Sequence, residues 1–254
     1  MTMIEMPQSF VTRQECDKVA FQNGFRRSHG EADGWRRYSS TTAQGSIWMA
    51  HDEDGGWLLA IDHTGVAEEL DAAAAPVEGP GVVRYTFTTL GLLYALMPRV
   101  YQLAASLPNA PLAQFQAKVK DLPTSTEAER LVVQRIGQDV FRSGLLEYWQ
   151  GRCPLTGIAD TPLLRASHIV PWKDCPSDAE RLDVHNGLLL SALWDAAFDR
   201  GLVSFDDTGH PLFSPALGAA ARDELRWHQP VRLTDSHRGR LAWHRANLFK
   251  EKSK

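Results

Sequence analysis

The first part of the chain combines one helical pattern of apolar residues with several short apolar runs. In residues 11–24 the apolar residues recur at helical spacing and Gly24 is a stop signal, which predicts a helix. The runs 34–39, 45–50 and 56–62 are rich in aromatic and aliphatic residues and are separated by turn-forming clusters. This order predicts a small antiparallel sheet accompanied by helices.

Two longer apolar segments follow. Residues 90–105 are strongly apolar and predict a helix that Pro98 kinks or divides. Residues 126–149 have apolar side chains at helical spacing and predict a long amphipathic helix, although two internal glycines weaken its helix propensity. Prolines between the two helices mark a connecting region. The sequence therefore predicts an α+β chain with domains at 1–122 and 123–254.

The segment 163–201 contains two short apolar runs, a loop and a helix, with polar residues at the junctions. Residues 163–170 and 187–190 predict two short strands, with a proline-containing loop between them. Residues 192–200 predict a short helix that ends at Gly201. The predicted order is therefore strand, loop, strand, helix.

Three polar side chains of this segment predict a metal-dependent site. Asp195 and Asp199 are four residues apart, so they share one face of the predicted helix. Adjacent carboxylates repel each other, and a hard divalent cation that prefers oxygen ligands removes this repulsion. His168 lies near the end of the first predicted strand, where its imidazole could act as a general base. Each residue alone is more simply interpreted as structural or solvated, but the combination favours a site.

The motifs around these residues resemble those of the HNH endonuclease family. The chain has Cys153, Thr156 and Gly157, then ASHIVPW from residue 166, NGLLLS from residue 186 and FDRG from residue 198. The family core is a ββα-metal fold with a His on the first strand, an Asn before the second and metal ligands on the helix. By this resemblance His168 is the general base, and Asn186 holds the loop and orients that base. Asp195 and Asp199 are then the ligands on the helix.

Two positions depart from the family pattern. Ser167 stands where many members have an acidic or histidine ligand, and Asp195 stands where the family usually has histidine. The second change makes the site richer in oxygen and favours Mg²⁺ or Mn²⁺ over Zn²⁺. Both changes keep open an alternative in which the core is degenerate and the chain is a non-catalytic DNA- or protein-binding module.

Charge is distributed unevenly along the chain. The formal net charge is −4, which excludes a chain that is basic throughout, but residues 222–254 hold nine Lys and Arg against four Asp and Glu. A local basic face can bind a polyanion even when the net charge is negative. The residues predicted to contact DNA are two near the site and four in the basic stretch: Arg165, Arg200, Arg238, Arg240, His244 and Arg245. A solvated basic face is an equally good interpretation of the last four.

The N-terminal domain is the predicted targeting or regulatory part. Its Trp35, Tyr38, Trp48 and Trp57 lie beside arginines and could stack on a flipped or modified base. Alternation of these rings into a sheet core is the favoured interpretation for most of them. The acidic balance of this domain argues against broad DNA binding, so its ligand stays unknown and could be a protein or a small molecule.

The chain has no signal-peptide pattern, and its longest apolar run is too short to span a membrane. Three scattered cysteines are expected to be reduced, as in the cytoplasm.

Together, these features predict a divalent-metal-dependent DNA endonuclease. The layout fits a restriction-type defence enzyme, including one that requires modified DNA, and a toxin or effector nuclease with an immunity partner is the alternative. A double-strand cut would suggest two active sites in a homodimer, or sequential nicking.

Overall fold

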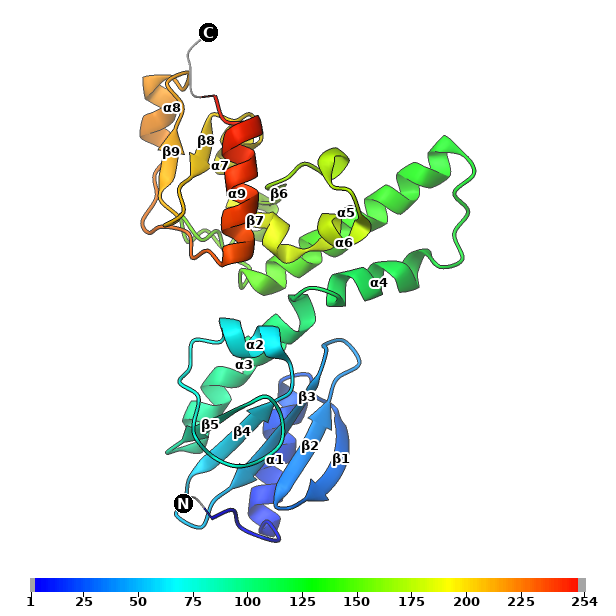
Figure 1. Cartoon of the computed structure of the whole chain (residues 1–254), viewed down its shortest axis with the longest axis vertical. Helices are drawn as coiled ribbons and strands as arrows, with labels where there is room; N and C mark the ends of the chain where they lie inside the picture. The colour runs from blue at the N-terminus through cyan, green and yellow to red at the C-terminus, as the bar shows by residue number, and fades with distance from the viewer. Residues whose placement is uncertain (1–2, 251–254) are drawn as a thin grey trace. The chain divides into compact units, whose positions relative to one another are not determined.

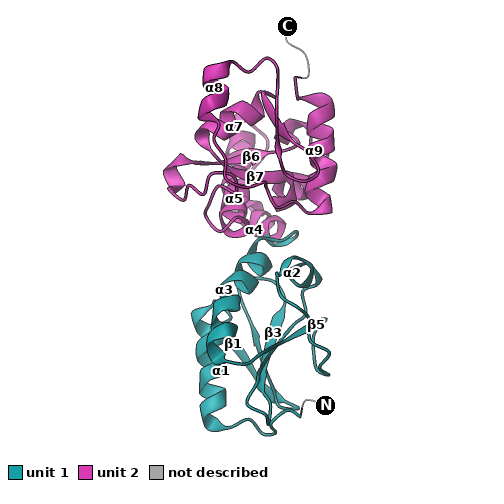
Figure 2. Ribbon diagram, turned by 90° about the vertical axis from the view of Figure 1, so that its left-hand side faces the viewer, with its two compact units in different colours: residues 1–110 teal, residues 111–254 magenta. Residues whose placement is uncertain are grey.

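The computed structural model describes residues 3–250. The chain divides into two compact units, residues 1–110 and 111–254 (Figure 2). The division lies near the start of helix α4 (Ala110–Val119), whereas the domain boundary predicted from the sequence lies after that helix. No helix within residues 3–250 is long and apolar enough to cross a membrane.

The first unit contains a five-stranded antiparallel sheet with its strands in sequence order (Figure 1). The strands are β1 (Arg27–Ala32), β2 (Trp35–Ser39), β3 (Ser46–His51), β4 (Trp57–Ile61) and β5 (Val83–Phe87). The three aromatic runs of the sequence correspond to β2, β3 and β4, which confirms the predicted antiparallel sheet.

Helices α1 (Phe10–Gln22) and α3 (Leu90–Ser106) lie on the same side of this sheet in Figure 2, and α2 (Thr64–Glu69) is a short helix of the same unit. Pro98 lies inside α3, so of the two predicted effects, a kink or a division, the division does not occur. Proline lacks the backbone N–H that would bond the preceding turn, but packing of the buried face of this long helix offsets one such loss.

Two of the aromatic side chains proposed for base stacking belong to the core. Trp35 is only 4% exposed and packs with Leu58 and Val77, and Tyr38 is fully buried. The Tyr38 hydroxyl donates to Asp17, which also accepts from Arg36. These two rings are therefore unavailable for stacking, as alternation into the sheet core predicts, whereas Trp48 and Trp57 are half-buried.

The second unit contains long and short helices around two small hairpins. After α4 its elements are α5 (Glu127–Tyr148), β6 (Leu164–His168), α6 (Asp178–Leu182), β7 (Gly187–Ser191), α7 (Ala192–Asp199), β8 (Val203–Phe205), β9 (Pro211–Phe213), α8 (Ala219–Glu224) and α9 (Asp235–Asn247). The start of α5 is fixed by a capping box, in which Thr126 and Glu129 bond each other's backbone N–H.

Strands β6 and β7 pair antiparallel, with His168 opposite Gly187. Helix α7 starts directly after β7 and packs against both strands. It buries Trp194, Ala197 and Phe198, whereas Leu193 is 48% exposed. The buried face of this short helix is therefore formed by the other three side chains.

Candidate functional site

The ring of His168 is held at the end of β6 by contacts on several sides. It stacks on the ring of Phe141, with centroids 3.8 Å apart and planes 17° apart, and meets the edge of Trp172 at 5.6 Å. Its Nε2 lies 2.9 Å from the backbone oxygen of Arg181. A carbonyl oxygen can only accept, so Nε2 carries the proton and Nδ1 keeps a free lone pair.

Burial lowers the pKa of His168 to about 4, and the bond to Arg181 opposes this shift only in part. The imidazole is therefore neutral at neutral pH. A neutral ring with its proton on Nε2 can accept a proton at Nδ1, which is the protonation state that a general base needs.

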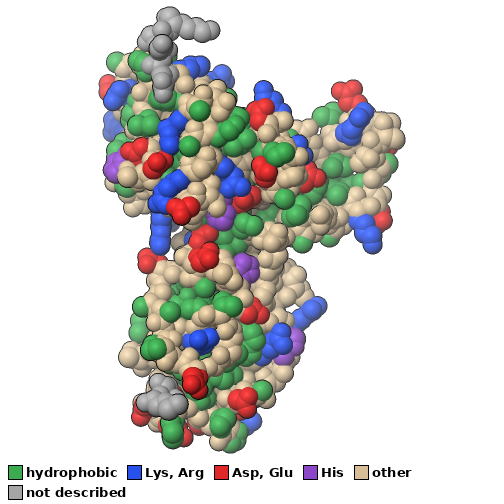
Figure 3. All heavy atoms as spheres, in the orientation of Figure 1, with side chains coloured by type: hydrophobic (Ala, Val, Ile, Leu, Met, Phe, Trp, Pro, Cys, Tyr) green, Lys and Arg blue, Asp and Glu red, His purple; other side chains and the backbone are tan. Residues whose placement is uncertain are grey.

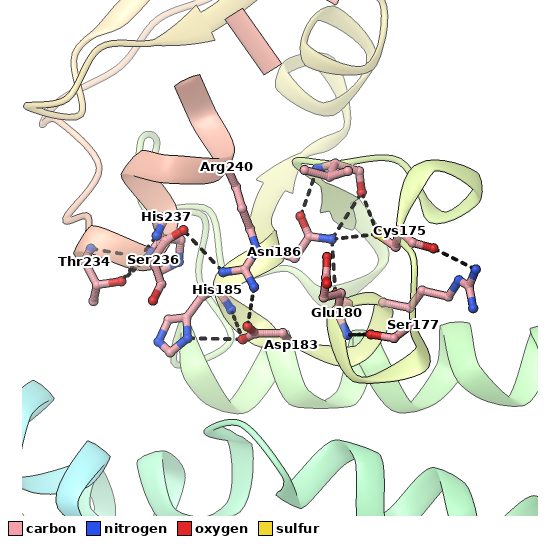
Figure 4. A network of polar contacts seen from close by, with 12 residues as sticks. Cys175, Ser177, Glu180, Asp183, His185, Asn186, Thr234, Ser236, His237 and Arg240 are labelled. Carbon is pink, nitrogen blue, oxygen red and sulfur yellow. Dashed lines mark hydrogen bonds and ion pairs between the residues drawn. The ribbon is translucent and has the colours of Figure 1, made fainter. Parts of the chain in front are cut away.

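Asn186 fixes the loop that connects the two strands (Figure 4). It is almost fully buried, and its Oδ1 accepts from the backbone N–H of Val170 at 2.9 Å. Its Nδ2 lies within hydrogen-bond distance of the Val170 oxygen, the Glu180 oxygen and the Cys175 sulfur. One side chain therefore joins the start and the end of the loop, immediately after His168.

A second polar cluster holds the short 3₁₀ turn Val184–Asn186 that presents Asn186 (Figure 4). Asp183 accepts from the backbone N–H of His185 at 2.9 Å and pairs with the His185 ring at 3.1 Å. Its other oxygen pairs with Arg240 of α9 at 2.5 Å. Burial alone would raise the pKa of Asp183, but His185 and Arg240 outweigh it and hold that pKa below its usual range. A residue of the last helix therefore supports the loop.

The two predicted metal ligands lie on α7. Asp195 accepts a hydrogen bond of 2.5 Å from the hydroxyl of Ser167, which is almost fully buried in β6. Burial first, and then the charge of Asp195, raise the pKa of Asp199, while Arg200 opposes this shift. The two carboxylates therefore repel each other, as their spacing predicts.

This pair fits a hard divalent cation by its donor chemistry. Mg²⁺ is commonly held by one or two carboxylates, with water and substrate phosphate completing its coordination. Within residues 3–250 no group of three or more His, Cys, Asp or Glu could hold a metal. The metal ligands available on α7 are therefore two carboxylates, Asp195 and Asp199, whose negative charges repel each other.

The residues predicted to contact DNA differ in their availability. Arg165 and Arg200 are exposed, although Arg165 also donates to the Pro162 and Leu164 carbonyls. On the face shown in Figure 3, basic side chains of the 111–254 unit are interspersed with acidic ones and form no single basic patch.

The four predicted contacts on α9 are engaged within the unit. Arg240 pairs with Asp183, Arg238 with Asp235, and Arg245 with Asp207. His244 is fully buried, lies 3.0 Å from the Ser204 hydroxyl and stacks on Phe198. This placement does not fit a phosphate contact by His244, because the surrounding core excludes a polyanion.

Sequence reasoning missed three residues that support the site: Phe141, Arg181 and Asp183. Phe141 carried only the signal of an apolar helix position. Arg181 donates to the Trp172 and Cys175 carbonyls, an arrangement with no local sequence signal. Asp183 accepts a hydrogen bond from the backbone N–H of His185, two residues later. This is the spacing of an Asx turn, so the sequence did contain a signal for Asp183.

Residues 153–206 match a family model described as HNH endonuclease. The match includes both strands, the loop and α7, so the chain carries an HNH endonuclease domain in its C-terminal half. The class of protein indicated by this domain is a nuclease. No curated protein matches the chain significantly.

Proposed function

We propose that the C-terminal half is a divalent-metal-dependent endonuclease that hydrolyses DNA phosphodiester bonds on a ββα-metal core formed by β6, β7 and α7. The observation that carries this proposal is the contact between His168 Nε2 and the Arg181 carbonyl, because it leaves Nδ1 as a proton acceptor. The family match over the same residues supports the reaction class.

In the proposed reaction, His168 Nδ1 takes a proton from the attacking water. The ring is neutral at neutral pH and is ready to accept this proton without a prior deprotonation. Asn186 acts on the loop that carries the Arg181 carbonyl, because its amide bonds Glu180 and Val170. Asn186 is therefore proposed as a positioning residue for the base.

Asp195 and Asp199 would hold Mg²⁺ or Mn²⁺, and the Ser167 hydroxyl would orient Asp195. When bound, the cation supplies positive charge to a non-bridging phosphate oxygen and to the leaving 3′-oxygen. By resemblance to the family, the products are 5′-phosphate and 3′-hydroxyl ends.

Arg165 and Arg200 are the proposed phosphate contacts, because both are exposed. Phosphate contacts carry little sequence information, so target choice would come from elsewhere. We assign this targeting or regulatory role to residues 1–122, and a restriction-type function fits the layout.

The alternative is a binding module on a degenerate core. This alternative is favoured by Ser167, which stands where many family members have a metal ligand. Its hydroxyl already donates a hydrogen bond to Asp195. In this case DNA would bind without being cut.

A plasmid-nicking assay distinguishes the nuclease from the non-catalytic binding module. Wild-type protein is incubated with supercoiled DNA, modified or unmodified, in Mg²⁺, Mn²⁺ or EDTA. The nuclease proposal predicts nicking that EDTA abolishes. Retention of DNA in a gel-shift assay without nicking on any substrate supports the binding module instead.

A further inference from the structure

Phe141 covers one face of the proposed base from a different part of the chain. It lies in α5, is 1% exposed, and its ring is nearly parallel to that of His168 at 3.8 Å. Residues before the matched segment 153–206 therefore contribute to the surroundings of the site.

Gly187 leaves the space that the Phe141 ring occupies. It lies opposite His168 in the strand pair, and its φ of −149° is extended backbone that any residue adopts. A Cβ at this position would lie 2.5 Å from Phe141 Cζ and 2.8 Å from Leu145 Cδ1. Glycine is consequently required here by space and not by backbone conformation.

The hydrogen bond to Arg181 cannot fix the tilt of the imidazole alone. Both ring nitrogens lie off the Cβ–Cγ axis about which the ring turns, and one hydrogen bond at Nε2 tolerates a spread of angles, so this bond restricts the direction of Nδ1 only in part. Torsions of this kind are intrinsically broad. A flat partner on one ring face restricts that rotation, and Phe141 is such a partner.

We propose that Phe141 and Gly187 are positioning residues that set the plane of the His168 ring and so the direction of Nδ1. Gly187 admits the Phe141 ring, and Phe141 fixes the imidazole. This inference rests on the proposed function of His168 as the base, but its structural part can be measured without any cleavage.

The first test compares Phe141→Leu with Phe205→Leu. Leucine keeps an apolar side chain but removes the flat face. Phe205 is a matched control because it is equally buried in the same unit and packs on Trp194 and Phe198, with no ring contact to His168. Single-turnover cleavage by Phe141→Leu should be about 10- to 100-fold slower with a KM within about twofold, as expected for a misdirected catalytic group. The control should lose much less activity, because Phe205 packs against α7 and not against the imidazole.

The second test uses Gly187→Ala, which should displace the Phe141 ring and slow cleavage to a similar extent. In the double variant the clash with the Phe141 ring is removed and only that with Leu145 stays, so the two losses should be clearly less than additive. Additive losses would contradict the mechanism, because they would mean that Gly187 acts independently of Phe141.

NMR of the His168 side chain separates this inference from the nuclease proposal. In the wild type the carbon-bound ring protons should be displaced upfield by the stacked phenyl ring, and the proton should be on Nε2. Phe141→Leu should lose the displacement and Phe205→Leu should keep it, whether or not the protein cuts DNA. Phe141→Met provides the same comparison if the leucine variant does not fold. Unchanged His168 signals in a folded Phe141 variant, or an equal rate loss in the Phe205 control, would overturn the inference.

Discussion

Acid should destabilise the 111–254 unit strongly, because three of its histidines are held neutral by burial. Burial lowers the pKa of His168 and of His244 to about 4 and that of His237 to about 3. In the unfolded chain all three should protonate near an ordinary value of about 6.5. The unfolded state therefore binds more protons than the folded state between these values, so its population rises as the pH falls.

The size of the effect follows from the gap between the two pKa values. At pH 5 a histidine with a folded pKa near 4 loses about 2 kcal/mol of folding free energy relative to pH 7, and three such residues lose about 6 kcal/mol together. This is comparable with the whole stability of a typical domain, about 5–15 kcal/mol. The contribution is fully present above pH 6.5 and is lost progressively as the pH falls toward 4.

Urea unfolding of residues 111–254 within the full chain, at pH 7 and at pH 5, measures this loss. A His244→Gln variant is the control, because it removes one of the three titrating groups. Its stability at pH 7 should be lower than that of the wild type, but the difference between pH 7 and pH 5 should shrink by about 2 kcal/mol. An unchanged pH dependence in this variant would refute the conclusion that His244 is buried in its neutral form.

Three further outcomes are expected. Arg240→Ala leaves the buried carboxylate of Asp183 without its arginine partner and should lower the free energy of unfolding in urea by about 3–5 kcal/mol. Adding Asp183→Asn should recover part of this loss. Wild-type stability of Arg240→Ala would show that the ion pair does not stabilise the unit. Asp199→Asn should weaken Mn²⁺ binding at least about tenfold in calorimetry while the protein stays folded, and equal affinity would remove α7 from the metal site. Asn186→Ala should speed hydrogen exchange at the Val170 amide, whereas unchanged protection there would mean that another contact holds the loop.

Local signals were sufficient for the elements that carry the site. The helix predicted at 192–200 is α7, and its two predicted strands are β6 and β7. These short elements were recognisable because apolar runs, a loop with prolines and a terminal glycine occur at the expected places. The helix predicted at 126–149 is α5, whose start is marked by the capping box at Thr126.

Elements with weak apolar patterns were missed. Strand β1 is almost entirely exposed at the edge of its sheet, so it has no alternating pattern to reveal it. Helix α4 lies in a stretch interpreted as a connection because of its prolines, although Pro111 is tolerated in the first turn of a helix.

Side-chain contacts between residues far apart in the sequence could not be predicted. Charge alone predicted that Arg240 faces DNA, but only the fold shows that its partner is Asp183, 57 residues away. In the same way, an apolar residue at a helix position gave no indication that Phe141 would stack on His168.

The most direct test of the nuclease proposal is the single-turnover cleavage rate of wild-type, His168→Ala and His228→Ala protein with Mg²⁺ or Mn²⁺. His228 is a control because it is an exposed histidine of the same unit. Cleavage by His168→Ala should be slower by a factor of about 10² to 10⁴, the usual contribution of a general base, while His228→Ala should cut at the wild-type rate. Metal-dependent cleavage that persists unchanged in His168→Ala would contradict the assignment of the base and, with it, the proposed active site.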